Sequence, residues 1–201
     1  MIYLENVSYR IKEKKILENI TYHFACGVYI LQGESGIGKT TLLNLLCGYL
    51  KPDKGKIKKK TKLKIGYMFQ EDMLFHNLTV RENFNIKCNA MELEEGNREK
   101  IIDKYCKQFK ITNKLDCRVS SLSGGEKKRV QMVMLAMDDC DVWLLDEPIA
   151  NLDMDNSNII IQYLFGLKNK VVFIVSHQFI QERDNSFTLL EMKDGRLYEK
   201  K

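Results

Sequence analysis

The 201-residue sequence lacks several features that would assign it to a well-known class of protein. None of its six cysteines belongs to a Cys-x-x-Cys pair, so neither a zinc site nor a disulfide framework is indicated, and a reducing cytosol is expected. No apolar run approaches the roughly 20 residues of a membrane helix, and the first residues contain no charged segment leading into an apolar one. We therefore expect neither a membrane span nor a signal peptide.

The sequence also lacks a marked excess of positive or negative charge. The chain has 32 basic and 27 acidic residues, and this net charge of +5 is too small to indicate a nucleic-acid partner, so none is expected. The biased stretch at residues 51–64 contains eight lysines. We interpret it as a solvated edge hairpin, because lysines discourage strands from aggregating. A nearby anionic membrane surface or RNA are the sharper alternatives.

Short apolar runs predict a mainly parallel sheet, and the length predicts one domain or one domain with a small lobe packed on it. Runs at residues 27–32, 64–70, 141–147 and 171–177 indicate strands, and the last two are typical of strands covered on both faces. Alternation near the start predicts half-buried strands, and Asp194-Gly195 predicts the turn of a final hairpin. Helices are expected after residue 39, around 155–168 and within 72–118, where Ile101, Ile102, Tyr105 and Phe109 share one face.

The stretch GESGIGKT at residues 33–40 is a Walker A pattern between a predicted strand and a predicted helix. Its glycines, Gly33, Gly36 and Gly38, let the backbone wrap closely around phosphates. Lys39 can reach the β and γ phosphates, and the Thr40 hydroxyl can hold Mg²⁺. The bare pattern arises by chance in about one chain per hundred, so its flanking elements favour a true nucleotide site. The other expected nucleotide contacts of this loop and helix start are Glu34, Ser35, Ile37 and Thr41.

Polar residues follow the other predicted core strands. Asp146 and Glu147 end one strand, and Gln70 and His177 end two others. A lone Gln or His at a strand end is usually only a satisfied polar residue. However, ligands of open parallel sheets bind outside the carboxyl ends of the strands, where all these residues would gather with Gly33. One carboxylate can hold the Mg²⁺ shell while the next accepts a proton from attacking water.

A second anion-binding turn, LSGGE at residues 122–126, precedes another predicted helix. With the motifs above, it makes the chain resemble the ATP-binding cassette (ABC) family, the ATPase subunits of ABC transporters, from Tyr9 to the final hairpin. The resemblance implies an α/β P-loop NTPase core with a mainly parallel sheet, a small antiparallel β lobe and an inserted α-helical lobe. It also implies one domain, 1–201, with the core at 1–70 and 121–201 and the helical subdomain at 71–120.

The resemblance further implies roles for single residues. The signature residues Ser123, Gly124, Gly125 and Glu126 would cap ATP held by the P-loop of a second subunit. Asp146 would order Mg²⁺, Glu147 would be the general base, and His177 would contact the γ-phosphate. Gln70 would contact Mg²⁺ or the attacking water, and Asp153 would lie along the dimer seam. Tyr9 would stack on adenine, although an ordinary strand tyrosine is a serious alternative.

The function implied is that of an ATPase subunit using Mg-ATP, cytoplasmic and peripheral on the inner face of the cell membrane. It would pair with a second ABC ATPase subunit and drive a transmembrane permease. Met73, Leu74 and Phe75 could dock that permease or fill the core of their own lobe.

The alternative is a soluble single-cassette ATPase of the assembly type, acting with non-membrane partners. The short spacing from Lys39 to Ser123 opposes a chromosome-type cassette with a coiled coil, and the single P-loop opposes a translation-type one. The signature opposes a P-loop kinase. Lys127 and Lys128 add charge where the family commonly has glutamines.

Overall fold

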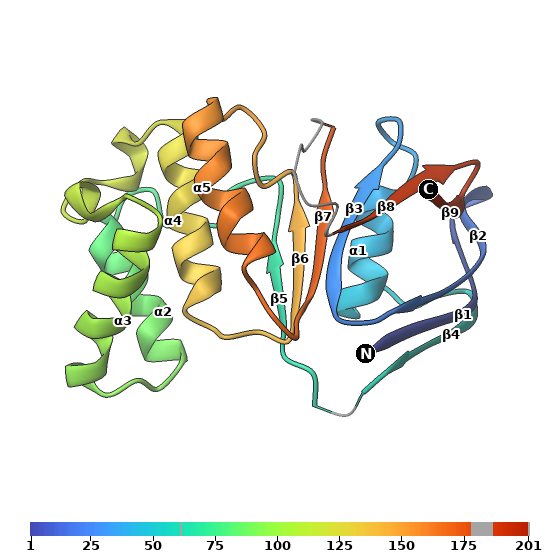
Figure 1. Cartoon of the computed structure of the whole chain (residues 1–201), viewed down its shortest axis with the longest axis horizontal. Helices are drawn as coiled ribbons and strands as arrows, with labels where there is room; N and C mark the ends of the chain where they lie inside the picture. The colour runs from blue at the N-terminus through green and yellow to red at the C-terminus, as the bar shows by residue number, and fades with distance from the viewer. Residues whose placement is uncertain (61, 178–186, 201) are drawn as a thin grey trace.

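The computed structural model describes residues 1–60, 62–177 and 187–200 (Figure 1). Its larger sheet has six strands in the order β5-β6-β7-β3-β8-β9. These strands are β3 (Gly27–Gln32), β5 (Ile65–Met68), β6 (Val142–Asp146), β7 (Val171–Val175), β8 (Phe187–Lys193) and β9 (Arg196–Lys200). All neighbouring pairs are parallel except β8 and β9, so the carboxyl ends of five strands lie along one edge. The mainly parallel sheet predicted from the sequence is confirmed.

The final hairpin is also confirmed. Asp194 and Gly195 join β8 to β9 with φ angles of 50° and 70°. A two-residue hairpin of this kind needs left-handed backbone at both central positions, which Asp and Gly tolerate.

A smaller antiparallel sheet has three strands in the order β2-β1-β4. They are β1 (Ile2–Ile11), β2 (Lys14–Phe24) and β4 (Lys54–Lys59). The prediction of a lysine-rich hairpin is wrong in one respect, because β4 is a single edge strand that pairs with β1. The ammonium of Lys58 lies 2.7 Å from a carboxylate oxygen of Glu5 on β1. The lysines thus border an open sheet edge, where their charge opposes further strand addition.

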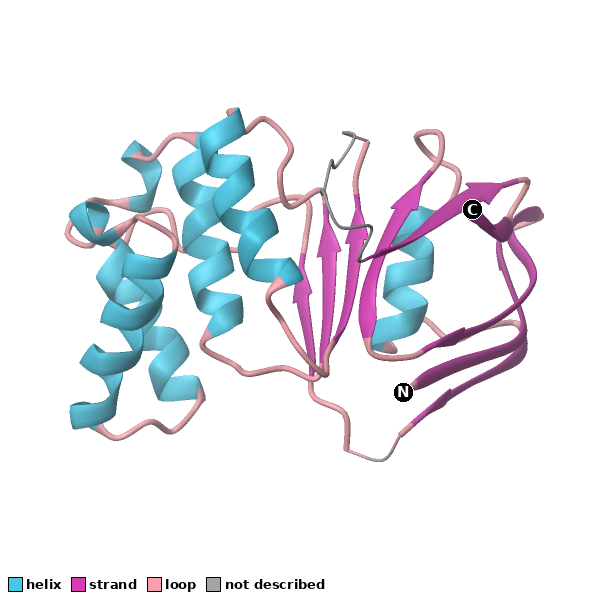
Figure 2. Cartoon of the chain, in the orientation of Figure 1, coloured by secondary structure: helices cyan, strands magenta, loops and turns pink. Residues whose placement is uncertain are grey.

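Helices cover both faces of the larger sheet (Figure 2). Helix α1 (Lys39–Cys47) lies between this sheet and the smaller one, whereas α4 (Gly124–Ala136) and α5 (Met154–Phe165) cover the other face. Alternate residues of β6 serve the two layers, since Val142 and Leu144 pack toward α1 and Trp143 and Leu145 toward α4 and α5. This burial on both faces explains why β6 and β7 are apolar throughout.

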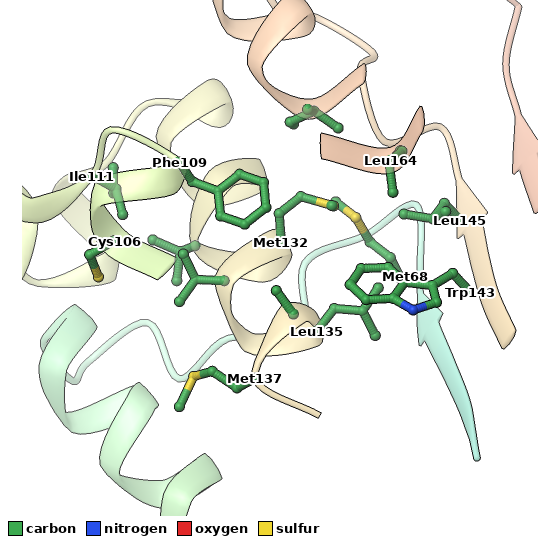
Figure 3. Close-up of a cluster of buried hydrophobic side chains, with 14 of the residues drawn as sticks. Met68, Cys106, Phe109, Ile111, Met132, Leu135, Met137, Trp143, Leu145 and Leu164 are labelled. Carbon is green, nitrogen blue, oxygen red and sulfur yellow. The ribbon is translucent and has the colours of Figure 1, made fainter. Parts of the chain in front are cut away.

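The segment predicted to be mostly helical, residues 72–118, contains α2 (Val80–Ala90), α3 (Glu95–Gln108) and the short 3₁₀ turn Thr112–Lys114, and a second 3₁₀ turn, Val119–Ser121, follows it. Its buried side chains continue into the core beneath α4, and Phe109 lies beside Met132 there (Figure 3). Of the residues predicted to share one apolar face, Ile102 in α3 and Phe109 directly after it are buried, and Ile101 and Tyr105 are partly buried. The division into a core and a helical subdomain stays a prediction. Among the helices that the structure describes, none combines the length and apolar composition needed to cross a bilayer.

Candidate nucleotide site

A glycine-rich loop, residues 33–38, joins the end of β3 to the start of α1. Gly33 and Gly38 have φ angles of 150° and 114°, which side chains rarely allow. A Cβ on Gly38 would lie 2.8 Å from Cγ2 of Ile16, and one on Gly33 would lie 2.8 Å from the carbonyl oxygen of Met192. The loop is therefore closely packed against β2 and β8, and its backbone can approach a phosphate without obstruction.

Lys39 is the first residue of α1, and its side chain returns to this loop. Its ammonium donates hydrogen bonds of 2.8 Å to the carbonyl oxygens of Gly33 and Glu34. Lys39 is only 6% exposed, and burial lowers its pKa, although the carboxylates of Glu147 and Asp146 oppose this shift. The loop therefore places a cation at a helix N-terminus, where backbone N–H groups also favour anions.

Thr40 and Asp146 bring two oxygen ligands together from different elements. The Thr40 hydroxyl donates a 2.7 Å hydrogen bond to Oδ2 of Asp146, the last residue of β6. Mg²⁺ prefers such oxygen donors and commonly takes one or two carboxylates together with substrate phosphates. Within residues 1–60, 62–177 and 187–200, no cluster of three His, Cys, Asp or Glu side chains could hold a metal alone. The donor set therefore fits Mg²⁺ that binds together with a nucleotide.

Glu147 follows Asp146 in a left-handed backbone conformation, with φ 53°. This conformation costs an L-residue about 1–2 kcal/mol. The Glu147 amide is held by the carbonyl oxygen of Val175 at 3.0 Å, and the side chain is 7% exposed. Its Oε1 lies 3.5 Å from Nε2 of His177 and has no hydrogen-bond partner among the residues described. A buried carboxylate oxygen without such a partner is well suited to accept a proton from water.

These groups line one open cavity of about 490 Å³. It brings together ten of the predicted residues: Ser35, Gly36, Gly38, Lys39, Thr40, Thr41, Gln70, Asp146, Glu147 and His177. Gly33 and Glu34 line an adjacent cavity, also beside His177. The remaining loop residue, Ile37, packs partly buried against the core that contains α1.

The apolar wall of the cavity was not predicted. It is formed by Ile11, which is 50% exposed, and Ile16, on either side of the turn from β1 to β2. Tyr9 is not among the lining residues and packs partly buried against the core of the smaller sheet. The stacking of Tyr9 on adenine stays a prediction. The only sequence signal for Ile11 and Ile16 is their place beside a turn.

The signature residues lie outside this cavity, at the start of α4. Ser123 caps the helix, since its hydroxyl accepts from the amide of Glu126 at 3.2 Å while the Glu126 carboxylate accepts from the amide of Ser123 at 2.8 Å. Lys114, 2.9 Å from Glu126, and this capping bond lower the pKa of Glu126. Ser123 and Gly124 remain exposed. A Cβ on Gly125 would lie 2.9 Å from Leu152, so the signature packs against the segment before α5.

That segment contains Asp153, which caps α5. Its two carboxylate oxygens accept from the amide and the side chain of Asn156 at 2.8 Å and 2.6 Å. The capping role explains this aspartate locally, and its place at a dimer seam stays a prediction. Asn151, with φ 62°, lines the cavity and was missed, although asparagine tolerates this left-handed conformation and is typical of such turns.

Lys128 connects the signature helix to Gln70, which lines the cavity. Its ammonium donates a 2.8 Å hydrogen bond to the carbonyl oxygen of Gln70. Burial lowers the pKa of Lys128, and the carboxylates of Asp146, Glu147 and Asp72 oppose this shift. The unusual lysine noted in the sequence therefore lies within electrostatic reach of Asp146 and Glu147, the two carboxylates of the cavity.

Comparison with known proteins identifies the family that has this arrangement. A sequence profile described as ABC transporter matches residues 17–150, which is more than half of the chain. The chain belongs to the ABC transporter family. It is an ATP-binding subunit of that family, and these subunits hydrolyse ATP. The resemblance given by the motifs is confirmed.

Individual relatives match over most of this chain. HrtA of Staphylococcus haemolyticus, an ATP-binding protein assigned to hemin import, is 30% identical over 92% of this chain and 91% of its own. ZnuC of Acinetobacter baylyi, a zinc import ATP-binding protein, is 32% identical over 88% of this chain and 68% of its own. The structure of cbiO1 from Clostridium perfringens, part of the ABC transporter complex cbiONQ, matches with a TM-score of 0.83 at 26% identity, over 98% of this chain and 86% of that one.

Proposed function

We propose that this ABC ATPase hydrolyses Mg-ATP as one half of a head-to-tail pair of cassettes. One observation carries this proposal: the cavity holds Lys39, Asp146 and Glu147 but none of the signature residues, which lie at a separate, exposed helix start. A second cassette, identical or different, would place its signature over this cavity and enclose the γ-phosphate. ATP would then join the two chains, and its hydrolysis would release them.

Each group in the cavity then has a task. Lys39 would bind the β and γ phosphates, and the paired oxygens of Thr40 and Asp146 would hold Mg²⁺. Bound Mg²⁺ would neutralise charge on the phosphate oxygens. Glu147 Oε1 would accept the proton of the attacking water, which Gln70 would help to orient from the cavity wall. His177, 3.5 Å from Oε1, would keep that carboxylate directed toward the reacting group.

The Glu147→Gln variant tests both the role of Glu147 as general base and the ATP-dependent pairing of two cassettes. The amide keeps the shape of the side chain but cannot take a proton, so hydrolysis should fall about 10²–10⁴-fold. Because the phosphate contacts remain, the variant should elute as a dimer with Mg-ATP in gel filtration. The control Lys39→Met, which lacks the phosphate cation, should stay monomeric. Hydrolysis near the original rate would exclude Glu147 as the base, and a monomeric Glu147→Gln would contradict ATP-dependent pairing.

A membrane permease is the partner that we propose, with the chain located at the inner face of the membrane. An open groove of about 320 Å³ lies between the edge strand β5 and helices α2 and α4, lined by Phe69, Met73 and Met134 among others. Met73 is 70% exposed, and the nearby Phe75 is 55% exposed, whereas Leu74 between them is 8% exposed. Leu74 is therefore part of the core, and the flanking residues form an apolar surface that a short permease helix could cover.

Phe75→Asp tests this surface. Because Phe75 is exposed, the variant should fold and keep its own ATP binding but lose coupling to the permease. Leu74→Asp, the matched buried change, should unfold the lobe. A tagged Glu147→Gln, solubilised from its host in mild detergent with Mg-ATP, should retain a protein with several membrane spans, and Phe75→Asp added to it should release that protein. Retention of a soluble complex would instead favour the assembly-type alternative.

A further inference from the structure

Two side chains of helix α4 form hydrogen bonds with the segment that follows β5. Lys128 donates to the carbonyl oxygen of Gln70 at 2.8 Å, and Gln131 Nε2 donates to the carbonyl oxygen of Glu71 at 3.3 Å. Residues three apart lie on the same helix face, so two neighbouring donors meet two consecutive carbonyl groups. Lys127 adds a weaker contact, with its ammonium 3.9 Å from a carboxylate oxygen of Asp72.

The other side of α4 is fixed to the core. Met132 and Leu135 point toward Met68 and Leu145 beneath the helix (Figure 3). Gln131 is 8% exposed, and Lys128 is half-buried and makes no ion pair with a described residue. Partial burial of an unpaired ammonium is unfavourable unless something offsets it. The carbonyl oxygen of Gln70 accepts one proton of this ammonium, and the carboxylates around the cavity favour its charge.

We propose that Lys128 and Gln131 form a clamp that positions Gln70 in the nucleotide cavity and ties it to the signature. Both ends of this link belong to one helix, since Lys128 is five residues after Ser123, about 7.5 Å along the helix axis. The clamp also has a regulatory consequence, which rests on the proposed function, the head-to-tail pair of cassettes. The signature end of α4 would contact the nucleotide of the partner, and the clamp would convey any shift of α4 to Gln70 at the chain's own nucleotide.

The first test reports on the clamp without requiring activity. Glu71 is exposed, and cleavage after it by a glutamate-specific protease requires the segment to open locally. Lys128→Met keeps the length of the stem but removes the donor, so cleavage after Glu71 should become about tenfold faster, as expected when a local contact is lost. Cleavage after Glu94, at the exposed start of α3, is the internal reference and should not change. Lys107→Met, which makes the same change on the exposed face of α3, is the matched control.

The second test separates positioning from binding. Lys128→Met should lower the kcat for Mg-ATP about tenfold with a KM within about twofold, because Gln70 is misplaced while Lys39 still binds phosphate. The Hill coefficient for ATP should fall toward one. Lys128→Arg, which keeps a charged donor, should restore most of both values, and Gln131→Met should produce a smaller loss of kcat.

The outcomes distinguish the clamp from the function on which it rests. Unchanged cleavage after Glu71 in Lys128→Met would overturn the clamp, even if the enzyme is active. Faster cleavage with an unchanged kcat would overturn the positioning role of Lys128. A Hill coefficient of one in the original protein would overturn the coupling between sites. Absence of Mg-ATP hydrolysis in the original protein would instead refute the proposed function, while the cleavage test would still report on the clamp.

Discussion

Replacing Gly38 by alanine should destabilise the chain by a steric mechanism whose size follows from the loop geometry. With φ 114°, an added Cβ would lie 2.8 Å from Cγ2 of Ile16 and 3.4 Å from its carbonyl oxygen. The backbone strain costs about 1–2 kcal/mol. Displacing the packed isoleucine costs about 1–3 kcal/mol more. The sum, roughly 2–5 kcal/mol, is a large part of the 5–15 kcal/mol typical of a folded domain.

Two other glycines separate strain from packing. Gly36 has φ 73° but no atom within 4 Å of an added Cβ, so Gly36→Ala should cost only the strain, about 1–2 kcal/mol. Gly96 lies in the first turn of α3, also with nothing within 4 Å. Gly96→Ala should therefore stabilise the chain by about 0.5–1 kcal/mol, because alanine loses less backbone entropy in a helix.

Urea unfolding at equilibrium measures all three changes. Trp143 is the only tryptophan and is 1% exposed, so its fluorescence reports loss of the core. The free energy of unfolding should decrease in the order Gly96→Ala, original protein, Gly36→Ala, Gly38→Ala, with similar m-values. Equal losses for Gly36→Ala and Gly38→Ala would show that the contact with Ile16 relaxes without cost, which would refute the steric part of the reasoning.

Two further predictions concern the apolar wall of the nucleotide cavity and the ion pairs of Asp138. Ile11→Tyr should lower the KM for ATP about 3–10-fold, because an aromatic ring at the cavity wall adds about 0.5–1.5 kcal/mol of stacking on adenine. Tyr9→Leu should leave the KM nearly unchanged. A KM raised by Tyr9→Leu and unaffected by Ile11→Tyr would instead identify Tyr9 as the residue that stacks on adenine. Burial raises the pKa of Asp138, but ion pairs with Lys87 and Lys64 outweigh this and lower it below its usual range. The paired carboxylate therefore stabilises the fold above the pKa of the unfolded chain, and this stability is lost as pH falls through the lower pKa of the folded state. Asp138→Asn should cost about 1–2 kcal/mol at pH 7 and almost nothing in strong acid, as chemical denaturation at each pH would measure.

The cavity could be predicted because a parallel sheet gathers its strand ends. Apolar runs located β3, β5, β6 and β7, and the polar residues after each run had to emerge along one edge. The strand ends themselves were less well predicted. Gln70 lies two residues beyond β5, and His177 lies two residues beyond β7. Phe69 and Ser176 follow the last paired residues of β5 and β7, Met68 and Val175. The apolar run at Phe69 and the small side chain of Ser176 made each strand look one residue longer in the sequence than its pairing is.

The apolar wall could not be predicted because β1 does not follow a simple alternation. Its pairing with β2 shifts register between Val7 and Tyr9 and again between Tyr9 and Arg10. Each irregularity of this kind changes which side of the sheet the following residues face. A two-residue period read from the sequence therefore cannot decide between Tyr9 and Ile11 as the residue beside the nucleotide. The structure places Ile11 on the cavity.

Lys128 shows a different limit of sequence reasoning. In the sequence it is one of two lysines after the signature, and adjacent lysines on a helix normally indicate a solvated face. Its contact is with Gln70, 58 residues earlier, and exists only because α4 packs beside the end of β5. Lys127, on the same helix turn, donates to no carbonyl oxygen of a described residue, and its ammonium lies 3.9 Å from a carboxylate oxygen of Asp72. Two residues of the same type at neighbouring positions thus differ in their contacts through tertiary packing alone. If Lys128 acts as we propose, exchanging Lys127 and Lys128 for methionine one at a time should affect kcat only at position 128.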